Sequence, residues 1–348
     1  MMQKLIEALR EAAGAQCILE QESMKKHTTF RIGGPADIFA VPDTIEKAAK
    51  IIGICREQKV PFYVIGNGSN LLVSDQGYRG VVVQVYKNLS AIEIKGDIIT
   101  AQAGAMLSVI AKKAMAASLT GFEFASGIPG TVGGAAVMNA GAYGHELKDV
   151  IESIQVYDRF THQIKIFSKA ELGMGYRTSI FQQDPQRWFI QSVVVSLIKG
   201  SKQALVQKRA EIVDQRAHRI PNLQRYPSCG SFFRNVIIAK SQAIQLQKQF
   251  PTLKMFDLPA DHIKISTGSI LKTLWPKGFH FQGVRMYPDS PLILINEGAT
   301  MDSVSCAIQT ILEKVYAHTK IQLEPEVRLM GIPLGKRSIF RYDESTRR

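Results

Sequence analysis

The sequence of 348 residues predicts an α+β protein with two β-rich lobes and a smaller α/β domain. Three observations support this fold class. Short β-rich runs alternate with Gly, Asn, Ser and Asp turns as far as residue 198. The pattern then changes to longer helical segments. Residues that break helices and strands occur where the pattern changes, and Pro227 and Gly230 mark the expected start of the last domain.

The composition is that of a globular protein, with 45% hydrophobic and 21% charged residues. The longest apolar runs, 193–198 and 292–295, have the length of strands and are far shorter than the roughly 20 residues of a membrane-spanning helix. Residues 1–13 carry Glu7 and Glu11 inside a helical pattern, which is unlike a secretory signal. We therefore expect a cytoplasmic protein that does not insert into membranes.

The cysteines are scattered along the chain at Cys17, Cys55, Cys229 and Cys306. They form no CxxC pair, and no histidine stands at a metal-ligand spacing from them. The sequence therefore predicts free thiols in a reducing compartment, with neither a metal site nor a disulfide framework.

The formal net charge of +13 is compatible with a nucleic acid, a membrane surface or an anionic small substrate as partner. Lys and Arg are spread along the chain, apart from modest clusters at 202–219 and 336–348. A nucleic-acid-binding protein would be expected to carry a basic stripe with interleaved aromatic residues, and the dispersed charges show no such stripe.

A turn of glycine and polar residues follows the strand predicted at 62–65. It consists of Gly66, Asn67, Gly68, Ser69 and Asn70. The turn is not a Rossmann fingerprint, because the third glycine is missing and a strand at 71–73 follows where the fingerprint needs a helix. We expect its N–H groups to bind a diphosphate through a turn and not through a helix end.

A second β region is predicted at 91–101, and an amphipathic helix at 106–118 comes after it. The expected apolar side of this helix holds Met106, Val109, Ile110 and Met115, and its exposed side holds Lys112 and Lys113.

The most informative segment is the glycine-rich run at 127–144, which surrounds one amide side chain, Asn139. Its glycines are Gly127, Gly130, Gly133, Gly134, Gly141 and Gly144. Such a backbone can approach a large flat or phosphorylated ligand closely and present N–H donors to it. A merely flexible loop is the alternative, but recurring apolar residues, Ile128 and Val132 among them, favour an ordered segment. The segment therefore predicts a cradle for a nucleotide cofactor.

The rest of the chain supplies further strands and helices. Strands are predicted at 151–157, 163–167, 189–198, 292–295 and 326–330. Helices are predicted at 201–216, 236–249, 266–274 and 302–318.

Arg177 is the first candidate for chemistry. It stands between Tyr176 and Phe181 on a segment between strands. Its fork of donors can neutralise an anion or stabilise developing negative charge. The alternative is a surface arginine that stacks on Tyr176.

Ser231 is the second candidate, held between Gly230 and the bulky Phe232. The GxSxG spacing of a nucleophile is absent, so its hydroxyl is better suited to donating a proton than to attack. Cys229 is a rival reactive group, and a turn serine that bonds backbone groups is the alternative.

Glu326 is the third candidate, at the head of the predicted closing strand. A carboxylate in that position can act as an acid or as an orienting group. A structural ion pair with Arg328 or another basic residue is the alternative.

Six motifs stand in order over nearly the whole chain, and together they resemble the UDP-N-acetylenolpyruvoylglucosamine reductase family. They are HTTFRIGGPA at 27–36, IGNGSNLLVSD at 65–75, GIPGTVGGAAVMNAGAYG at 127–144, GYRTSIF at 175–181, CGSFFRN at 229–235 and LEPEVRLMG at 323–331.

The resemblance implies a two-lobed FAD-binding fold of the vanillyl-alcohol-oxidase (PCMH) type plus a smaller α/β substrate-binding domain. The implied boundaries are 1–88 with 325–348 for the first lobe, 89–220 for the second and 221–324 for the UDP-sugar domain.

By the same resemblance, non-covalent FAD is the cofactor and NADPH the co-substrate. The implied FAD-binding residues are Gly66, Asn67, Gly68, Ser69, Asn70, Gly127, Ile128, Pro129, Gly130, Gly133, Gly134, Asn139, Gly141 and Ala142.

The reaction implied is reduction of an enolpyruvyl UDP-sugar to UDP-N-acetylmuramate, a step of peptidoglycan synthesis that serves cell wall formation, cell shape and division. Ser231 matches the family's proton donor. Arg177 and Glu326 match the groups that bind the carboxylate and stabilise the enolate-like intermediate.

The sequence departs from the family pattern at three places. The connection from Arg177 to Ser231 is short, so the substrate-closing insertion of longer members is expected to be absent. The segment 265–275 lacks the acidic residue usual there, and Cys229 replaces a small aliphatic residue, which predicts unusual sensitivity to thiol reagents.

An FAD oxidoreductase of the same superfamily with another substrate is the alternative function. A covalent oxidase would need a flavin-attaching His or Cys, and 127–144 offers neither, although His145 lies just beyond.

Overall fold

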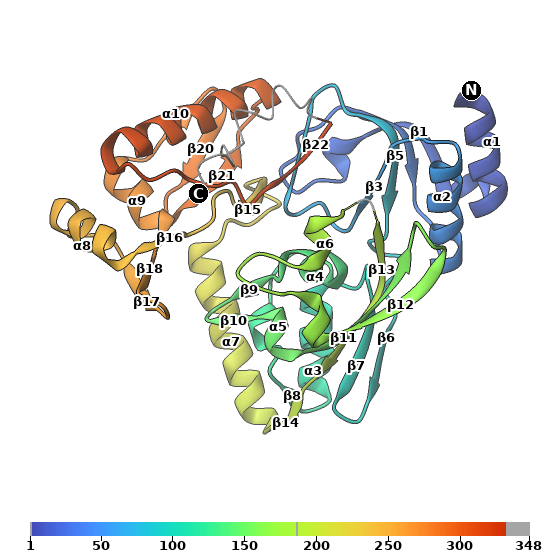
Figure 1. Cartoon of the computed structure of the whole chain (residues 1–348), viewed down its shortest axis with the longest axis horizontal. Coiled ribbons are helices and arrows are strands. Elements are labelled where there is room, and N and C mark those ends of the chain that lie inside the picture. The colour runs from blue at the N-terminus through green and yellow to red at the C-terminus, as the bar shows by residue number, and fades with distance from the viewer. Residues whose placement is uncertain (1, 186, 332–348) are drawn as a thin grey trace. The chain divides into compact units, whose positions relative to one another are not determined.

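The computed structural model describes residues 2–185 and 187–331, and these form two compact units (Figure 1). Unit 1 consists of Met1–Glu22, Pro35–Gly68 and Tyr78–Ala217. Unit 2 consists of Ser23–Gly34, Ser69–Gly77 and His218–Arg348. The three domains expected from the sequence, 1–88 with 325–348, 89–220 and 221–324, stay a prediction.

Two helices of unit 1, α1 and α2, pack side by side next to a mainly parallel sheet of order β1-β2-β5-β3 (Figure 1). The predicted first helix is confirmed, because Leu5, Ile6 and Leu9 are buried on one face. The bounds are α1 Met2–Ala13, β1 Ile18–Ser23, β2 Pro35–Ala40, α2 Ile45–Glu57, β3 Phe62–Ile65 and β5 Tyr78–Gln84.

A five-stranded antiparallel sheet of order β12-β11-β13-β7-β6 forms the second β layer of unit 1. Its strands are β6 Ile92–Lys95, β7 Ile98–Gln102, β11 Ile151–Asp158, β12 Gln163–Ser168 and β13 Trp188–Ser196. These bounds confirm the strands predicted from alternating apolar residues. Alternate residues such as Ile154 and Val156 are buried because one face of the sheet packs on the core.

The helix predicted at 106–118 is α3, Leu107–Ala116, but its apolar side differs from the prediction. Leu107, Ile110, Ala111 and Ala114 form the buried face. Val109 is 44% exposed, so placing it on the buried side was wrong. The small alanines allow close packing on the face they share with Ile110, which turns Val109 outward.

The remaining elements of unit 1 are short except for α7, which ends before Pro221 as predicted. They are β8 Leu119–Thr120, α4 Val132–Met138, β9 Gly141–Ala142, β10 His145–Glu146, α5 Leu147–Val150, α6 Ile180–Gln183, β14 Ile198–Lys199 and α7 Lys202–Arg219.

Unit 2 is built on a four-stranded sheet of order β15-β21-β20-β19, against which α9 and α10 pack (Figure 1). The predicted helix at 302–318 is confirmed as α10, with Val304, Ile308, Ile311 and Val315 buried. The bounds are β15 Ser228–Ser231, α9 Thr267–Leu274, β19 His280–Phe281, β20 Val284–Tyr287, β21 Ser290–Asn296 and α10 Met301–Thr319.

Unit 2 also contains a three-stranded sheet of order β16-β18-β17. Its elements are β16 Val236–Ala239, α8 Lys240–Gln249, β17 Met255–Leu258 and β18 His262–Ile265. The single helix predicted at 236–249 was therefore wrong at its start. Val236, Ile237 and Ile238 are β-branched and pair with β18, which overrides the helical pattern.

The chain returns near its end to the strand that follows the first glycine turn. Strand β22, Arg328–Met330, pairs in parallel with β4, Leu71–Val73. A closing strand was predicted at 326–330, and it begins two residues later than expected. Both strands belong to unit 2.

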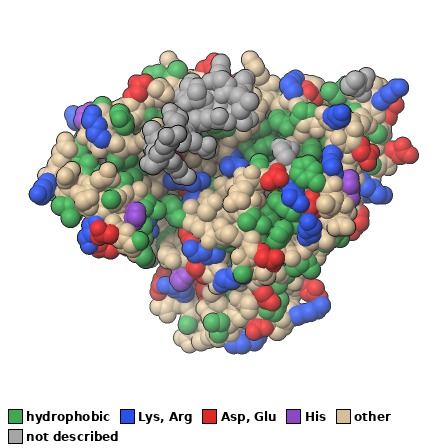
Figure 2. Space-filling model, viewed as in Figure 1, with side chains coloured by type: hydrophobic (Ala, Val, Ile, Leu, Met, Phe, Trp, Pro, Cys, Tyr) green, Lys and Arg blue, Asp and Glu red, His purple; other side chains and the backbone are tan. Residues whose placement is uncertain are grey.

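The apolar character of the helices and the distribution of surface charge bear on the expected absence of a membrane or nucleic-acid partner. Among the described helices, none is both long and apolar enough to cross a membrane. On the face shown in Figure 2, Lys and Arg side chains are scattered among acidic ones and form no single stripe.

Candidate active site

The turn at 66–70 presents unpaired backbone donors. It follows β3 and leads directly into β4, as predicted, and Gly68 has a φ of +61°. Within residues 2–185 and 187–331, the backbone N–H groups of 67–70 donate to no protein acceptor. A turn with free N–H groups and one residue of positive φ is a typical anion-binding concavity. This geometry suits a phosphate group.

The turn lies directly against the glycine segment in unit 1. The side-chain amide of Asn67 donates to the carbonyl oxygen of Pro129 at 2.7 Å. A Cβ atom on Gly66 would lie only 2.2 Å from Oγ1 of Thr131. Glycine at position 66 is therefore required for this contact, which joins the two predicted cofactor-binding stretches.

Residues 132–138 of the glycine segment form the short helix α4, which was not predicted. Glycine disfavours helices, so Gly133 and Gly134 hid it from the sequence pattern. The local signal was Thr131, whose hydroxyl oxygen accepts from the N–H of Gly134 at 3.4 Å as an N-cap. A Cβ on Gly133 would lie 2.8 Å from the Ala103 side chain. This glycine therefore serves packing within the chain.

Asn139 ends α4 in the left-handed conformation and is fully buried. Its amide nitrogen donates to Glu146 at 3.0 Å and to the carbonyl of Gly175 at 2.8 Å. Its amide oxygen accepts from the N–H of Lys148 at 2.9 Å. These bonds give Asn139 a structural role, which links the glycine segment to the loop of Arg177. Its contact with a ligand stays a prediction.

Arg177 is fixed on the end of the glycine segment. It has a φ of +55° and lies in a tight turn closed by the pair Gly175 and Thr178. Its Nη2 donates to the carbonyl oxygen of Gly141 at 3.2 Å. The guanidinium carbon also lies 5.3 Å from the ring centre of Tyr176. Arg177 therefore stacks on Tyr176, as the alternative interpretation expected, and it also contacts Gly141, a predicted cofactor-binding residue.

Ser231 and Glu326 come together in unit 2. Ser231 ends β15, and the next residue, Phe232, accepts at its carbonyl oxygen from the N–H of Glu326 at 2.8 Å. Phe232 and Phe233 are fully buried, as expected for anchors of this strand. Gly230, with a φ of +78°, makes the bend before Ser231. Arg177 belongs to unit 1, whereas Ser231 and Glu326 belong to unit 2.

Asn70 links the first turn to Glu326. Its side-chain amide donates to the backbone carbonyl of Glu326 at 3.2 Å, and its own carbonyl accepts from the N–H of Arg328 at 3.1 Å. A predicted cofactor-binding residue therefore holds the backbone of a predicted catalytic residue.

Cys229 is not a reactive thiol. It is only 1% exposed, and burial raises the pKa of its thiol to about 12. A buried neutral thiol reacts slowly, because the thiolate is the nucleophile. The expected sensitivity to thiol reagents through Cys229 was therefore wrong, and the same burial argues against Cys229 as a rival to Ser231.

Sequence reasoning missed Ser126, which precedes the glycine segment. It is 1% exposed, and its hydroxyl has no hydrogen-bond partner within the described residues. Buried polar groups are normally paired. A buried, unpaired hydroxyl beside Gly127 therefore fits a site that a bound molecule completes.

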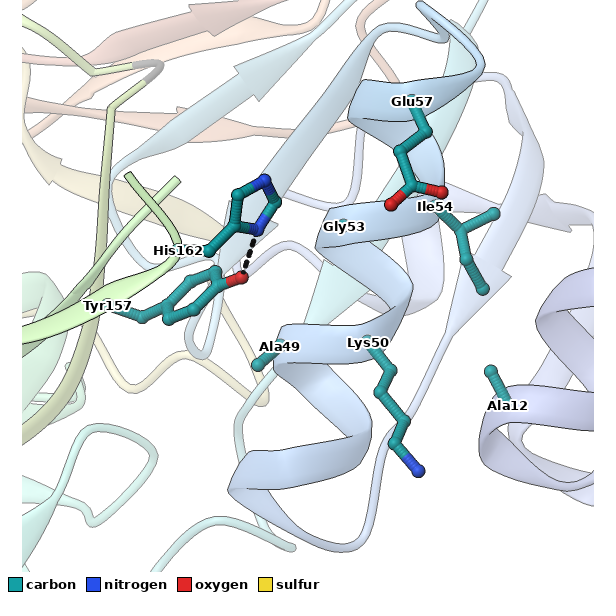
Figure 3. Close-up of a pocket in the computed structure, with 8 residues that line it drawn as sticks. All are labelled: Ala12, Ala49, Lys50, Gly53, Ile54, Glu57, Tyr157 and His162. Carbon is teal, nitrogen blue, oxygen red and sulfur yellow. Dashed lines mark hydrogen bonds between the residues drawn. The ribbon is translucent and has the colours of Figure 1, made fainter. Parts of the chain in front are cut away.

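A pocket of about 340 Å³ lies elsewhere in unit 1, between α2 and the hairpin of β11 and β12 (Figure 3). The Tyr157 hydroxyl and Nδ1 of His162 lie 2.7 Å apart on the hairpin side. Lys50, Gly53 and Glu57 line it from α2. The predicted site residues do not line this pocket.

Both glycine stretches, 66–70 and 127–144, lie within a region that matches a known protein family. Residues 36–163 match the model of an FAD binding domain family. The fold and the matched family thus define an FAD-binding protein of α+β class, as predicted.

Residues 221–330 match the model described as UDP-N-acetylenolpyruvoylglucosamine reductase, C-terminal domain. A protein named UDP-N-acetylenolpyruvoylglucosamine reductase in Caldanaerobacter subterraneus is 37% identical over 95% of this chain and 99% of its own. One of that name in Alkaliphilus oremlandii is 36% identical over 94% of this chain and 98% of its own. The chain therefore belongs to the UDP-N-acetylenolpyruvoylglucosamine reductase family.

A solved structure supports this assignment. UDP-N-acetylenolpyruvylglucosamine reductase from Thermus caldophilus is similar to this chain with a TM-score of 0.68 and 26% identity. The match covers 89% of this chain and 98% of that one.

Proposed function

We propose that this protein is an FAD-dependent oxidoreductase that reduces UDP-N-acetylglucosamine enolpyruvate to UDP-N-acetylmuramate, with NADPH as the source of hydride. The observation that carries the proposal is the 37% identity to a reductase of this name over 95% of the chain. The match includes both the FAD binding domain and the family's C-terminal domain. The enzyme then serves peptidoglycan synthesis and hence cell wall formation.

The residues around the two glycine stretches fit FAD. The N–H groups of 67–70, which have no acceptor in the part of the chain that the structure describes, suit a phosphate. The buried hydroxyl of Ser126, likewise without a partner there, can form a hydrogen bond to a bound molecule. When bound, FAD accepts hydride from NADPH and delivers it to the terminal vinyl carbon of the substrate. Nine of the sixteen residues at 127–142 are glycine or alanine, and at these positions no side chain beyond Cβ can block a flat ring system.

Arg177 is proposed to bind the substrate carboxylate. Its guanidinium is held by the carbonyl of Gly141 and by the face of Tyr176, so its orientation is fixed before substrate arrives. A preorganised cation of this kind stabilises negative charge that develops beside the carboxylate.

Ser231 is proposed to give its hydroxyl proton to the carbon next to the carboxylate. A serine hydroxyl is a weak acid, so it can donate only to a strongly basic carbon nearby. The carbanion that hydride addition leaves beside the carboxylate meets this condition. Glu326, whose backbone is bonded to Phe232 and Asn70, is proposed to orient this donor and to stabilise the enolate-like intermediate.

We place the enzyme in the cytoplasm and its UDP-sugar substrate on the C-terminal domain, residues 221–324. The family model at 221–330 supports the second assignment, and the relatives' name supports a small UDP-sugar as partner.

The test is an anaerobic half-reaction assay with purified holoenzyme. One equivalent of NADPH should bleach the oxidised flavin spectrum. Addition of the enolpyruvyl UDP-sugar should then restore it, whereas UDP-N-acetylglucosamine without the enolpyruvyl group should leave it bleached. Restoration by neither compound would contradict the proposed substrate, and a colourless purified protein would contradict the proposed cofactor.

A further inference from the structure

The pocket between α2 and the hairpin of β11 and β12 is lined by none of the predicted cofactor-binding or catalytic residues (Figure 3). Its volume is about 340 Å³, which is enough for a small molecule. Ala49, Gly53 and Ile54 of α2 form an apolar wall, and Ala12 of α1 also lines the pocket. All of its lining residues belong to unit 1.

A chain of hydrogen bonds fixes the polar side of this pocket. Nη1 of Arg56 lies 3.2 Å from Nε2 of His162, and Nδ1 of His162 lies 2.7 Å from the Tyr157 hydroxyl. An arginine can only donate, so Nε2 accepts and the imidazole carries its proton on Nδ1. Nδ1–H therefore donates to the Tyr157 oxygen, and the proton of that hydroxyl is left for another acceptor.

The Tyr157 hydroxyl is thus a donor held in place beside the pocket. Within residues 2–185 and 187–331, it forms no hydrogen bond other than the one with His162. Burial raises the pKa of this hydroxyl, so it stays protonated and remains a donor at neutral pH. Figure 3 shows the Tyr157 side chain pointing from the hairpin toward α2. A bound molecule with an acceptor atom would complete this chain of hydrogen bonds.

Two opposite charges line the pocket from α2. Lys50 and Glu57 are both exposed, and neither forms an ion pair within the part of the chain that the structure describes. Lys47, on the same helix, does pair with Asp43. Lys50 and Glu57 stand about 10 Å apart along the helix axis, and Figure 3 shows their charged groups well separated. The pocket therefore offers a cation near one end and an anion near the other.

Gly53 keeps the space between these two charges open. It lies in the interior of α2, where glycine is a weaker helix former than alanine. A Cβ at this position would meet nothing within 4 Å, whereas at Gly66 and Gly133 it would collide with a neighbouring side chain. Packing of the chain therefore does not require glycine at position 53. The missing side chain leaves room for a ligand instead.

We propose that this pocket binds a small, elongated zwitterion, an amino-carboxylic acid in its simplest form. The anionic end of the ligand accepts from the Lys50 ammonium and the Tyr157 hydroxyl. Its cationic end faces the Glu57 carboxylate, and the apolar part between them packs on Gly53. A ligand with a single charge would leave either Lys50 or Glu57 without a partner. This inference does not depend on the proposed function, because the two sites share no residue.

The test uses the purified holoenzyme, with 6-aminohexanoate as the probe and ¹³C label in the isoleucine methyl groups. Ile54 lines the pocket, and Ile54→Val identifies its NMR signal. The probe should shift this signal saturably, with a Kd in about the millimolar range, because exposed ion pairs contribute little each. Hexanoate and hexylamine, which carry one charge each, should bind about two to five times more weakly.

Two charge-removing variants assign the ends of the ligand. Lys50→Gln should remove the advantage of 6-aminohexanoate over hexylamine, and Glu57→Gln should remove its advantage over hexanoate. Both residues are exposed, so both variants should fold. Glu46→Gln is the matched control, because Glu46 is exposed on the same helix and does not line the pocket. It should leave the Kd of the probe unchanged.

Two further variants test the other walls. Tyr157→Phe should raise the Kd of the probe, because it removes only the donor. Gly53→Met should abolish binding, because a flexible side chain then fills the space beside the helix. The Tm and the flavin spectrum of Gly53→Met show whether its fold is intact.

The inference is overturned if 6-aminohexanoate gives no saturable shift of the Ile54 signal. It is also overturned if hexanoate or hexylamine binds as tightly as the probe, because the pocket then does not select a zwitterion. Binding that is unchanged in both Lys50→Gln and Glu57→Gln would likewise contradict it.

Discussion

The backbone N–H of Glu326 donates to the carbonyl oxygen of Phe232 at 2.8 Å, which places the residue after Ser231 opposite Glu326. Phe233 and Pro325 form the adjoining antiparallel bridge, and the N–H of Arg234 donates to the carbonyl of Glu324 at 2.9 Å. The proposed proton donor and its carboxylate neighbour are therefore carried on two paired backbone segments.

Ser231→Ala separates the two half-reactions. Flavin reduction by NADPH should stay nearly unchanged, because the proposed role of Ser231 concerns the substrate carbon. Reoxidation by the enolpyruvyl UDP-sugar should slow by about two to four powers of ten, the usual contribution of a general acid. Anaerobic stopped-flow absorbance measures both rates. Equal slowing of both would refute the assigned role.

Gly66→Ala should disrupt the contact between the two glycine stretches. The new methyl group would lie 2.2 Å from Oγ1 of Thr131, and such overpacking costs about 1–3 kcal/mol. We expect weaker FAD binding and a lower Tm. The double variant with Thr131→Ala should regain part of the loss, less about 1 kcal/mol for the missing helix cap. No recovery in the double variant would show that this clash is not the cause.

Gly53→Ala is the opposite case. Gly53 lies inside α2, and a Cβ there would meet nothing within 4 Å. Alanine should therefore stabilise the helix by about 0.5–1 kcal/mol, because glycine loses more backbone entropy on folding. Urea unfolding measures the gain, and FAD binding should not change. Destabilisation would mean that the open space beside Gly53 is needed.

Asp158 should make the stability depend on acid pH. Burial opposes ionisation, but hydrogen bonds from Arg187, the N–H of Phe160 and Lys165 outweigh it and hold the pKa of the carboxyl well below its usual range. This stabilisation is present above the unfolded value of about 3.9 and is lost as the pH falls below it. Asp158→Asn should lower the free energy of unfolding at pH 7 by on the order of 2 kcal/mol.

The effect of Asp158→Asn should shrink below pH 4, where the wild type begins to lose the same interaction. Asp257→Asn is the control, because its ion pair with Lys240 is exposed and should contribute little at either pH. A constant difference between pH 3 and pH 7 would argue against the lowered pKa.

Thiol labelling should distinguish one cysteine from the others. Cys306 is exposed, whereas Cys17, Cys55 and Cys229 are buried. Burial also raises the pKa of the Cys55 thiol to about 12. A chromogenic disulfide reagent should label Cys306 quickly in the native protein and all four thiols only in denaturant. Rapid loss of activity in Cys306→Ser on treatment would contradict the burial of Cys229.

Periodic patterns predicted most of the fold, because burial of one face leaves a direct trace in sequence. Helix α10 shows this, because its buried residues include all four that were predicted from their helical spacing. The prediction failed where tertiary contacts decide the structure. Glycines concealed α4, in which Gly133 packs closely against Ala103. Strand β16 was taken for helix because its partner β18 is distant in sequence.

The candidate site followed the same rule. The glycine stretches and the candidates Arg177, Ser231 and Glu326 could be singled out from the residues themselves, and the resemblance added the expected role of each. Ser126 could not be found, because its burial and its lack of a hydrogen-bond partner within the described residues depend on tertiary packing that no local pattern records. An unsatisfied hydrogen-bonding group can be recognised only when the positions of all the surrounding residues are known.

The core of unit 2 contains Phe30, Ile32 and Leu72 from the first quarter of the chain together with residues beyond 228. During synthesis on the ribosome, these early apolar side chains emerge long before their partners exist. Their later partners in this core begin only at Cys229, so synthesis must pass that residue before these contacts can form. A fragment starting at residue 218 would conversely lack them, and we expect such a fragment to aggregate when expressed alone.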